Sequence, residues 1–316
     1  MDKPKLVHDG AKAPSGSDPC FEEEIAALRA HIERRLGELF PNRISSDLNA
    51  AIAHGLLSPG KRLRPLITLF ACRQCGGDAL EAIDAACAVE MVHAASLIVD
   101  DLPCMDNAQL RRNGEATHVA FGEGIGILAA IALVNEAFAT ISKMQQAEYR
   151  QRIIAIEKLS NAIGVNGLAA GQERDLSRNG DAPKGGIGEI EKSHLEKTGA
   201  LFASAAGIGA VLAGARTVEI DAMERFGAAL GLAYQTFDDV IDAQCDETET
   251  GKDAGQDEKR TTVVTMLGAD SANKSAEEWI FTAIKEAEKV DCGAGSPLTG
   301  LARLIEQKFS KMMRKS

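Results

Sequence analysis

The stretch SLIVDDLPCMDNAQLRR (residues 96–112) carries three aspartates around a proline and ends on two adjacent arginines. On an ideal helix Asp100 and Asp106, which are six positions apart, would lie about 240° from one another around the axis. Pro103 disfavours helical geometry at Leu102 and lacks a backbone donor. We therefore expect the chain to bulge at this proline and to bring Asp106 back toward Asp100.

A second acidic motif, YQTFDDVIDA (residues 234–243), contains Asp238, Asp239 and Asp242. Asp238 and Asp242 are four positions apart, so on a helix they share one face. Like charges at that spacing repel, which indicates that a cation lies between them. Carboxylates without cysteine or histidine favour Mg²⁺, and the sequence has no EF-hand calcium loop.

Each acidic motif lies in an otherwise apolar segment, with Leu97 and Ile98 in the first and Phe237 and Ile241 in the second. A solvated acidic helix face would explain either motif by itself. Two such motifs in segments that should be buried favour a functional site, because buried carboxylates require cations.

Basic residues accompany these motifs at three places: Lys61, Arg62 and Arg64 before an apolar helix, Arg111 and Arg112 after the first motif, and Lys197 beside Thr198 at the start of a helix of small residues. Arginine binds phosphate through two parallel hydrogen bonds, and lysine supplies a point charge. The sequence therefore predicts two polyphosphates, one bound to the carboxylates through metal and one bound directly. It contains no GxxxxGK[ST] nucleotide loop.

His93 lies seven residues before Asp100, so on a continuous helix it shares the face of that aspartate. A lone histidine in an apolar helix is often a satisfied core residue. Its alignment with Asp100 makes a ligand-binding role equally acceptable.

Apolar residues recur at helical spacing through most of the chain, and no alternating strand pattern dominates. We expect an all-α fold of roughly ten or more helices around a central cavity. The expected helices include residues 80–101, 125–142, 149–171, 187–215, 218–245, 276–290 and 298–313. Residues 1–19, polar and rich in proline and glycine, are expected to form a disordered lead, and residues 20–316 a single domain. The charged segment 245–260 is either a lid over the site or a solvated loop.

The overall charge restricts the partners and the compartment. A formal net charge of -11 disfavours nucleic acid and anionic lipid surfaces, so an anionic substrate must meet a local basic cluster. Seven cysteines in a long chain without a leader pattern are typical of a reducing cytoplasm. The uncharged run 199–215 is shorter than a membrane span needs, so we expect a buried, closely packed helix and no integral membrane association.

The combination of motifs resembles the trans-isoprenyl (polyprenyl) diphosphate synthases. The matching segments, in the family's order, are PGKRLRP, VEMVHAASLIVDDLPCMDNAQLRR, NGLAAGQERDL, EKTGALF and YQTFDDVID followed by GKDAGQD. Their wording is most similar to that of bacterial geranylgeranyl diphosphate synthases. The resemblance implies the isoprenoid synthase fold, a cytoplasmic homodimer, and a prenyltransferase that condenses isopentenyl diphosphate with an allylic diphosphate.

The same resemblance implies roles for individual residues. Asp100, Asp106, Asp238 and Asp242 would hold Mg²⁺, about three ions per active site with substrate bound, and Asp101 and Asp239 would support them. The residues implied for the allylic diphosphate are Arg111, Lys197, Thr198, Gln235, Lys252 and Arg260. Those implied for isopentenyl diphosphate are Lys61, Arg64, His93 and Arg112.

The chain departs from the common family pattern at a few positions. Ala130-Ile131 stands where many relatives carry Gly-Asp, although the carotenoid-type subgroup is similar to this chain. Either Lys259 or Arg260 fills the last allylic-phosphate position. By resemblance, an aromatic side chain at Ala95 would favour a fifteen-carbon product, so the small Ala95 and Ser96 indicate twenty carbons or more. The alternative for Ala95 is simple helix packing.

Other functions remain open on the sequence alone. A farnesyl or longer-chain synthase would carry the same motifs. A terpene cyclase or a head-to-head synthase could share the helical scaffold, but cyclases lack the basic set that a second diphosphate requires. A non-catalytic subunit would be expected to lose an aspartate motif. A helical scaffold for protein partners leaves the order of the motifs unexplained.

Overall fold

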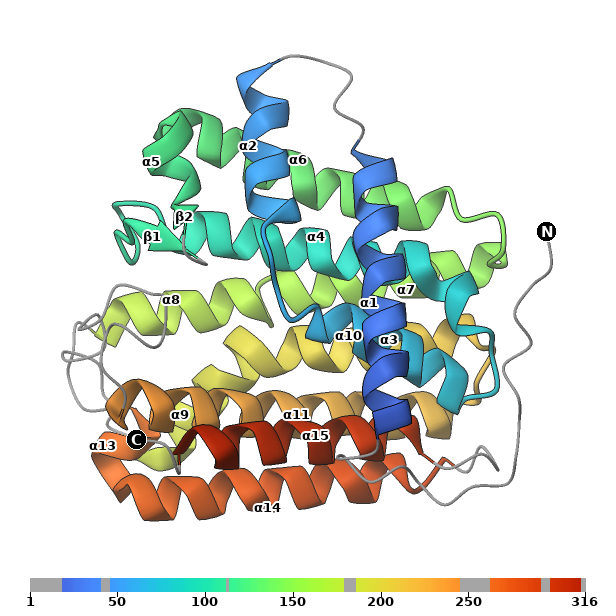
Figure 1. Cartoon of the computed structure of the whole chain (residues 1–316), viewed down its shortest axis with the longest axis vertical. Helices are drawn as coiled ribbons and strands as arrows, with labels where there is room; N and C mark the ends of the chain where they lie inside the picture. Colours follow the sequence, from blue (N-terminus) through green and yellow to red (C-terminus); the bar gives the residue numbers. More distant parts are fainter. Residues whose placement is uncertain are drawn as a thin grey trace.

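The computed structural model describes residues 19–40, 46–111, 114–178, 186–244, 262–290 and 296–313. Helices dominate (Figure 1), with bounds α1 Pro19–Leu39, α2 Asp47–Leu57, α3 Leu63–Gln74, η1 Ala79–Ala82, α4 Ile83–Asp100, α5 Thr117–Phe121, α6 Glu123–Ser142, α7 Tyr149–Ile163, α8 Leu168–Arg178, α9 Ile187–His194, η2 Leu195–Gly199, α10 Ala200–Leu212, α11 Thr217–Gln244, α13 Val263–Leu267, α14 Ala269–Ala287 and α15 Pro297–Met313. The all-α prediction is confirmed.

A short antiparallel ladder is the exception among the described residues. Strands β1 (Leu110–Arg111) and β2 (Gly114–Glu115) pair Leu110 with Glu115 and Arg111 with Gly114. Two residues per strand are too few to produce a period-two pattern, so the sequence did not predict them. The ladder follows directly on the first acidic motif and brings Arg111 back toward it.

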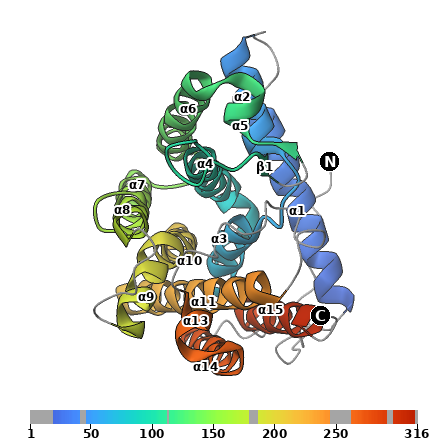
Figure 2. The ribbon, with the colours of Figure 1, turned by 90° about the vertical axis from the view of Figure 1, so that its left-hand side faces the viewer.

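Helices α3, α4 and α10 lie in the middle of the molecule, between α2 and α6 at one end and α11, α14 and α15 at the other (Figure 2). Nearly every residue of α10 from Leu201 to Val211 is buried. A Cβ at Gly209 would lie 2.2 Å from the carbonyl oxygen of Thr68, so α10 packs against the backbone of α3 itself. The expected burial of the run 199–215 is therefore observed for α10.

Two expected helices are interrupted. The segment 149–171 forms α7 and then α8, because Gly164 and Gly167 end the first helix and form a turn. The segment 187–215 forms α9, the π-helical turn η2 and α10. Apolar periodicity continues through both interruptions, which is why it predicted single helices.

Three helical segments of the described chain are long and apolar enough to cross a membrane by length and composition: Ala79–Asp100, Glu123–Ser142 and Ile187–Leu212. The apolar windows of the first and third are each 67% buried inside the protein, and that of the second is 39% buried. The segment containing α6 thus has the least of its apolar surface covered. The expectation on membrane association stays a prediction.

The expected lead is outside the described residues except for Pro19, which begins α1. The segment 245–260, expected to be a lid or a solvated loop, is outside them entirely.

Candidate active site

The first acidic motif begins where α4 ends. Helix α4 stops at Asp100, and the backbone N–H of Asp106 donates to the carbonyl oxygen of Asp100 at 2.9 Å. Asn107 adopts a left-handed backbone conformation with φ of 51°, and its N–H donates to the carbonyl of Leu102 at 3.0 Å. The bulge that Pro103 predicted is observed, and it returns Asp106 to Asp100.

Asp100 lies in a desolvated position between charges of both signs. Burial, together with the neighbouring charge of Asp106, raises its pKa to about 6 against the opposing effect of Lys197 and Arg111. The local cations therefore do not offset the cost of ionising this carboxylate. An additional cation would stabilise its charged form.

Asp101 has a different environment from Asp100. It accepts a hydrogen bond from Arg111 Nε at 2.8 Å and a second, short one from Nη2 of the same side chain. Its side chain is only 3% exposed. Asp101 thus holds the arginine that the resemblance assigned to the allylic diphosphate.

The second acidic motif occupies the last turns of α11. Asp239 is buried and accepts hydrogen bonds from Gln235 Nε2 at 3.2 Å and from the backbone N–H of Val263 at 3.4 Å. His194 Nε2 lies 3.6 Å from the same carboxylate. Asp238 is half-buried and Asp242 exposed, so these two are the more accessible carboxylates. No motif or spacing singled out His194 as a site residue.

The π-helical turn η2 lies between the two acidic motifs. Lys197 Nζ forms an ion pair with Asp175 Oδ2 at 2.9 Å, and the charges of Asp175, Asp100 and Asp106 raise the pKa of this lysine against the effect of burial. Thr198 donates from Oγ1 to Gln235 Oε1 on α11 at 2.8 Å. One turn thus connects the end of α4 with the end of α11, and both ends lie on the left of Figure 1.

A π-turn widens the helix and is often found at functional sites. Here it fits against α8, because a Cβ at Gly171 would lie 2.5 Å from the backbone nitrogen of Lys197. Asp175, also on α8, accepts a hydrogen bond from Ser193 at 2.8 Å in addition to its pair with Lys197. Asp175 was missed as a site residue, although it lies in the matching segment NGLAAGQERDL.

The basic residues at the start of α3 lie in two different environments. Lys61 is exposed and donates to Tyr234 Oη at 3.2 Å, and Arg64 Nη1 lies 3.1 Å from His93 Nε2. Arg62 is fully buried, and its guanidinium pairs with Glu33 at 2.6 Å and Glu90 at 2.7 Å. Arg64 and His93 are thus brought together as predicted, whereas Arg62 is a structural residue. Tyr234 was not predicted as a partner.

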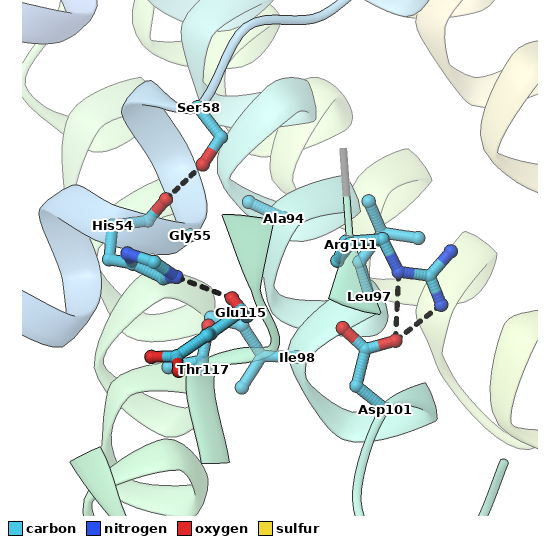
Figure 3. Close-up of a pocket in the computed structure, with 10 residues that line it drawn as sticks. All are labelled: His54, Gly55, Ser58, Ala94, Leu97, Ile98, Asp101, Arg111, Glu115 and Thr117. Atoms are coloured by element: carbon cyan, nitrogen blue, oxygen red, sulfur yellow. Dashed lines mark hydrogen bonds and ion pairs between the residues drawn. The ribbon is translucent and has the colours of Figure 1, made fainter. Parts of the chain in front are cut away.

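A cavity opens beside the first motif, between α2, α4 and the β-ladder (Figure 3). It is lined by Ala94, Leu97 and Ile98 and bordered by the Asp101–Arg111 pair; opposite, His54 Nε2 lies 2.8 Å from the carbonyl oxygen of Glu115. These α4 residues form the helix face next to the one that carries His93, Ser96 and Asp100.

The two residues expected to control product length lie on α4. Ala95 is 3% exposed, and Ser96 Oγ donates to the carbonyl oxygen of His93 at 2.9 Å. Both side chains are small, and the predicted role of the two residues in product length stays a prediction. Arg112, Lys252 and Arg260 lie outside the described residues, so their predicted roles stay predictions.

The carboxylates fit Mg²⁺ by chemistry rather than by a preformed cluster. Among the described residues, no three His, Cys, Asp or Glu side chains gather closely enough to hold a metal ion by themselves. Mg²⁺ in phosphate-binding sites takes one or two carboxylates and completes its shell with water and substrate phosphate oxygens. Desolvated Asp100 beside Asp106 provides that kind of donor pair.

Comparison with known proteins agrees with this geometry. Residues 45–292 match the family model of polyprenyl synthetases. The chain is 43% identical over 246 residues to a geranylgeranyl diphosphate synthase from Pantoea ananas, covering 76% of this chain and 79% of that protein.

Solved structures share the fold. Geranylgeranyl pyrophosphate synthetase from Pyrococcus horikoshii Ot3 matches with a TM-score of 0.81 at 27% identity, over 91% of this chain and 99% of that one. A geranyltransferase from Helicobacter pylori, solved with magnesium and isoprenyl diphosphate, matches with a TM-score of 0.78 at 26% identity, over 95% and 99%. The chain belongs to the polyprenyl synthetase family of trans-prenyltransferases, as its motifs predicted.

Proposed function

We propose that this chain joins isopentenyl diphosphate to an allylic diphosphate and that its main product is geranylgeranyl diphosphate. The proposal is carried by the position of the η2 turn. On one side of this turn the charges of Asp100 and Asp106 raise the pKa of Lys197, and on the other side Thr198 is hydrogen-bonded to Gln235. Two acidic motifs far apart in sequence thus serve one site.

The aspartates would act on the allylic diphosphate. Asp100, Asp106, Asp238 and Asp242 would hold Mg²⁺, about three ions with substrate bound, and Mg²⁺ supplies the charge neutralisation that lets pyrophosphate depart. Lys197 and Arg111 would contact the same diphosphate, each already oriented by a carboxylate, Asp175 and Asp101 respectively. The solved relative from Helicobacter pylori, which contains magnesium and isoprenyl diphosphate, supports this assignment.

The bond changes follow from the departure of pyrophosphate. When the allylic carbon–oxygen bond breaks, its electron pair leaves with pyrophosphate and a carbocation remains. Thr198 of η2 is hydrogen-bonded to the Gln235 amide, and the carbonyl dipoles of this turn and of that amide would favour positive charge. The double bond of isopentenyl diphosphate attacks the cation, and loss of a proton to pyrophosphate restores a double bond.

Lys61, Arg64 and His93 would bind the diphosphate of isopentenyl diphosphate. Arg64 lies in the first turn of α3, where free backbone N–H groups and the helix dipole favour an anion. Arg64 and His93 already meet at 3.1 Å, and Lys61 is exposed beside them. Arg112 is assigned to the same group by the motif alone.

Small side chains at Ala95 and Ser96 support a twenty-carbon product, as does the similarity to the Pantoea ananas enzyme. Substituting Ala95→Tyr would place an aromatic ring one to two turns before Asp100. We expect this variant to shift the main product from twenty to fifteen carbons, measured by chromatography of the dephosphorylated alcohols. An unchanged product would contradict the role of Ala95.

We also propose a homodimer formed through α6. Ile127, Leu128 and Ile131 of this helix are 44%, 51% and 55% exposed, and they recur at helical spacing on one apolar face. Such a face is unusual on a free surface and typical of an interface. The cytoplasm is the compartment we propose, and among the described cysteines Cys72, Cys87 and Cys104 are free thiols.

The proposal is tested by incubating purified protein with Mg²⁺, isopentenyl diphosphate and a five-, ten- or fifteen-carbon allylic diphosphate. We expect Mg²⁺-dependent release of pyrophosphate and a twenty-carbon product. A main product of another length would contradict the product assignment alone. No turnover with any starter would overturn the proposed function.

A further inference from the structure

We infer that three aromatic residues from three different helices position the cations of the isopentenyl diphosphate site. Phe202 on α10, Tyr234 on α11 and Phe309 on α15 form what we call the aromatic shelf. This inference rests on the proposed function, because it concerns how Lys61 and Arg64 are presented to the second diphosphate.

Lys61 lies over two rings of the shelf. Its Nζ is 5.5 Å from the centroid of Tyr234 and 5.6 Å from that of Phe309, within the range of cation–π attraction. The same atom donates to Tyr234 Oη at 3.2 Å. Three weak contacts thus restrict a side chain that is otherwise exposed to solvent.

Arg64 lies over the third ring. Its guanidinium carbon is 4.6 Å from the centroid of Phe202, while Nη1 reaches His93 at 3.1 Å. The ring and the imidazole together restrict the plane of the guanidinium. A fixed plane suits the paired hydrogen bonds that arginine makes to phosphate.

The shelf is one continuous packing unit. Phe202 lies 5.8 Å from Tyr234, and Tyr234 meets Phe309 edge to face at 5.3 Å between centroids. Phe309 in turn stacks on Phe237 at 4.8 Å, one residue before Asp238. Phe202 is fully buried and Phe309 is 4% exposed, so the rings under the cations are held rigidly by the core.

A cation held over an aromatic ring differs electrostatically from a cation paired with a carboxylate. Arg111 and Lys197 are each paired with an aspartate, and Arg62 with two glutamates. Within the part of the chain that the structure describes, no carboxylate lies within ion-pair distance of Lys61. A ring attracts a cation without neutralising it, so Lys61 keeps its full charge for a diphosphate that binds without metal.

Arg62 fixes the backbone from the other side. It has a left-handed conformation with φ of 48°, which is unfavourable for a side chain with a Cβ. Its buried ion pairs with Glu33 and Glu90, and a hydrogen bond to the carbonyl of Ser58 at 2.8 Å, hold this conformation. Arg62 thereby fixes the backbone between Lys61 and Arg64, whose side chains lie over the shelf.

The test substitutes Phe309→Leu, which removes a ring but keeps an apolar side chain, and Phe309→Tyr, which keeps the ring. The Kd of isopentenyl diphosphate is measured by titration calorimetry without Mg²⁺ and without allylic substrate. We expect Phe309→Leu to weaken the binding of isopentenyl diphosphate about three- to fivefold. Phe309→Tyr should bind it with wild-type affinity. The KM for the allylic substrate should stay unchanged.

Two controls separate positioning from a general packing effect. In a Lys61→Gln background, Phe309→Leu should cause no further loss of affinity, because the two residues act through one contact. Phe281→Leu removes a ring that lies 5.4 Å from Lys285 on the surface of α14, and it should leave the Kd unchanged. If Phe309→Leu does not fold, Tyr234→Leu at the half-buried ring tests the same contact.

The inference would be overturned if folded Phe309→Leu bound isopentenyl diphosphate with wild-type affinity. It would also be overturned if Phe309→Leu weakened binding equally in the presence of Lys61 and in the Lys61→Gln background. Turnover of the wild-type protein is measured separately. If the wild-type protein turns over and Phe309→Leu leaves the Kd unchanged, only the role of the aromatic shelf is refuted. If Phe309→Leu weakens the binding of isopentenyl diphosphate but the wild-type protein shows no turnover, only the proposed function is refuted.

Discussion

At the scale of single residues, the site contains carboxylates that folding alone does not favour. Burial raises the pKa of Asp100 to about 6 from an ordinary value of 3.8. Ionised Asp100 therefore lowers the stability of the metal-free protein at every pH above its folded pKa, and this cost disappears as the pH falls toward 3.8. Under the proposed function, the side chain is retained for the Mg²⁺ that it would bind.

Substituting Asp100→Asn should accordingly stabilise the protein while removing turnover. In EDTA at pH 7.5 we expect the Tm of the variant to exceed that of wild type by about 2–5 °C, and the difference to shrink as the pH approaches 4. Thermal unfolding followed by circular dichroism measures both. The exposed Asp221→Asn on α11 serves as a control that should show neither effect. A less stable Asp100→Asn at pH 7.5 would contradict this account.

Motif spacing identifies some of the individual site residues and misses others. The aspartates, Lys61, Arg64 and His93 were predicted because charge in an apolar segment is unusual and visible in one sequence. Asp175, His194, Tyr234 and Phe309 were not predicted as site residues, because each is ordinary in its own segment and acquires its role from a neighbour on another helix.

At the scale of elements, the π-turn η2 depends on the close approach of α8. Gly171 permits this approach, because a Cβ there would meet the backbone of Lys197 at 2.5 Å. Apolar periodicity predicted a single helix across residues 187–215, since a π-turn adds one residue without changing the burial of the flanking turns. The position of Lys197 between two acidic motifs is therefore set by a contact between helices.

Gly171→Ala should displace η2 and impair the site. We expect a loss of about 1–3 kcal/mol in the free energy of unfolding and a fall in kcat of about tenfold or more. Denaturant unfolding and steady-state kinetics measure the two effects. Gly188→Ala on α9 is the matched control, since nothing lies within 4 Å of its added Cβ. Equal behaviour of the two variants would refute the role of Gly171.

At the scale of the whole molecule, helix α6 carries an exposed apolar face formed by Ile127, Leu128 and Ile131. Ile131, at 55% exposure, stands next to buried Ala130, at the pair where many family members carry Gly-Asp. An aspartate at this position would be compatible with solvent, whereas isoleucine favours a dry contact. The apolar substitution is therefore consistent with a dimer interface.

Leu128→Glu should disrupt the proposed dimer. We expect wild-type protein to elute with the mass of a dimer in size-exclusion chromatography with light scattering, and the variant to elute as a monomer. Val165→Glu, at a side chain that is 85% exposed in the turn between α7 and α8, should leave the dimer intact. A monomeric wild type, or a dimeric Leu128→Glu, would exclude this interface.

The sequence by itself determined the all-α class, the two aspartate motifs, the basic residues and the family, because helical periodicity and charge spacing are local properties of the chain. It also predicted the return of Asp106 toward Asp100, since Pro103 acts within its own turn. Only the tertiary structure decided that Arg62 is buried against glutamates while Lys61 and Arg64 rest on aromatic rings, and that η2 connects the two acidic motifs. These features depend on contacts between helices distant in the chain, and their burial energies do not appear in any local pattern.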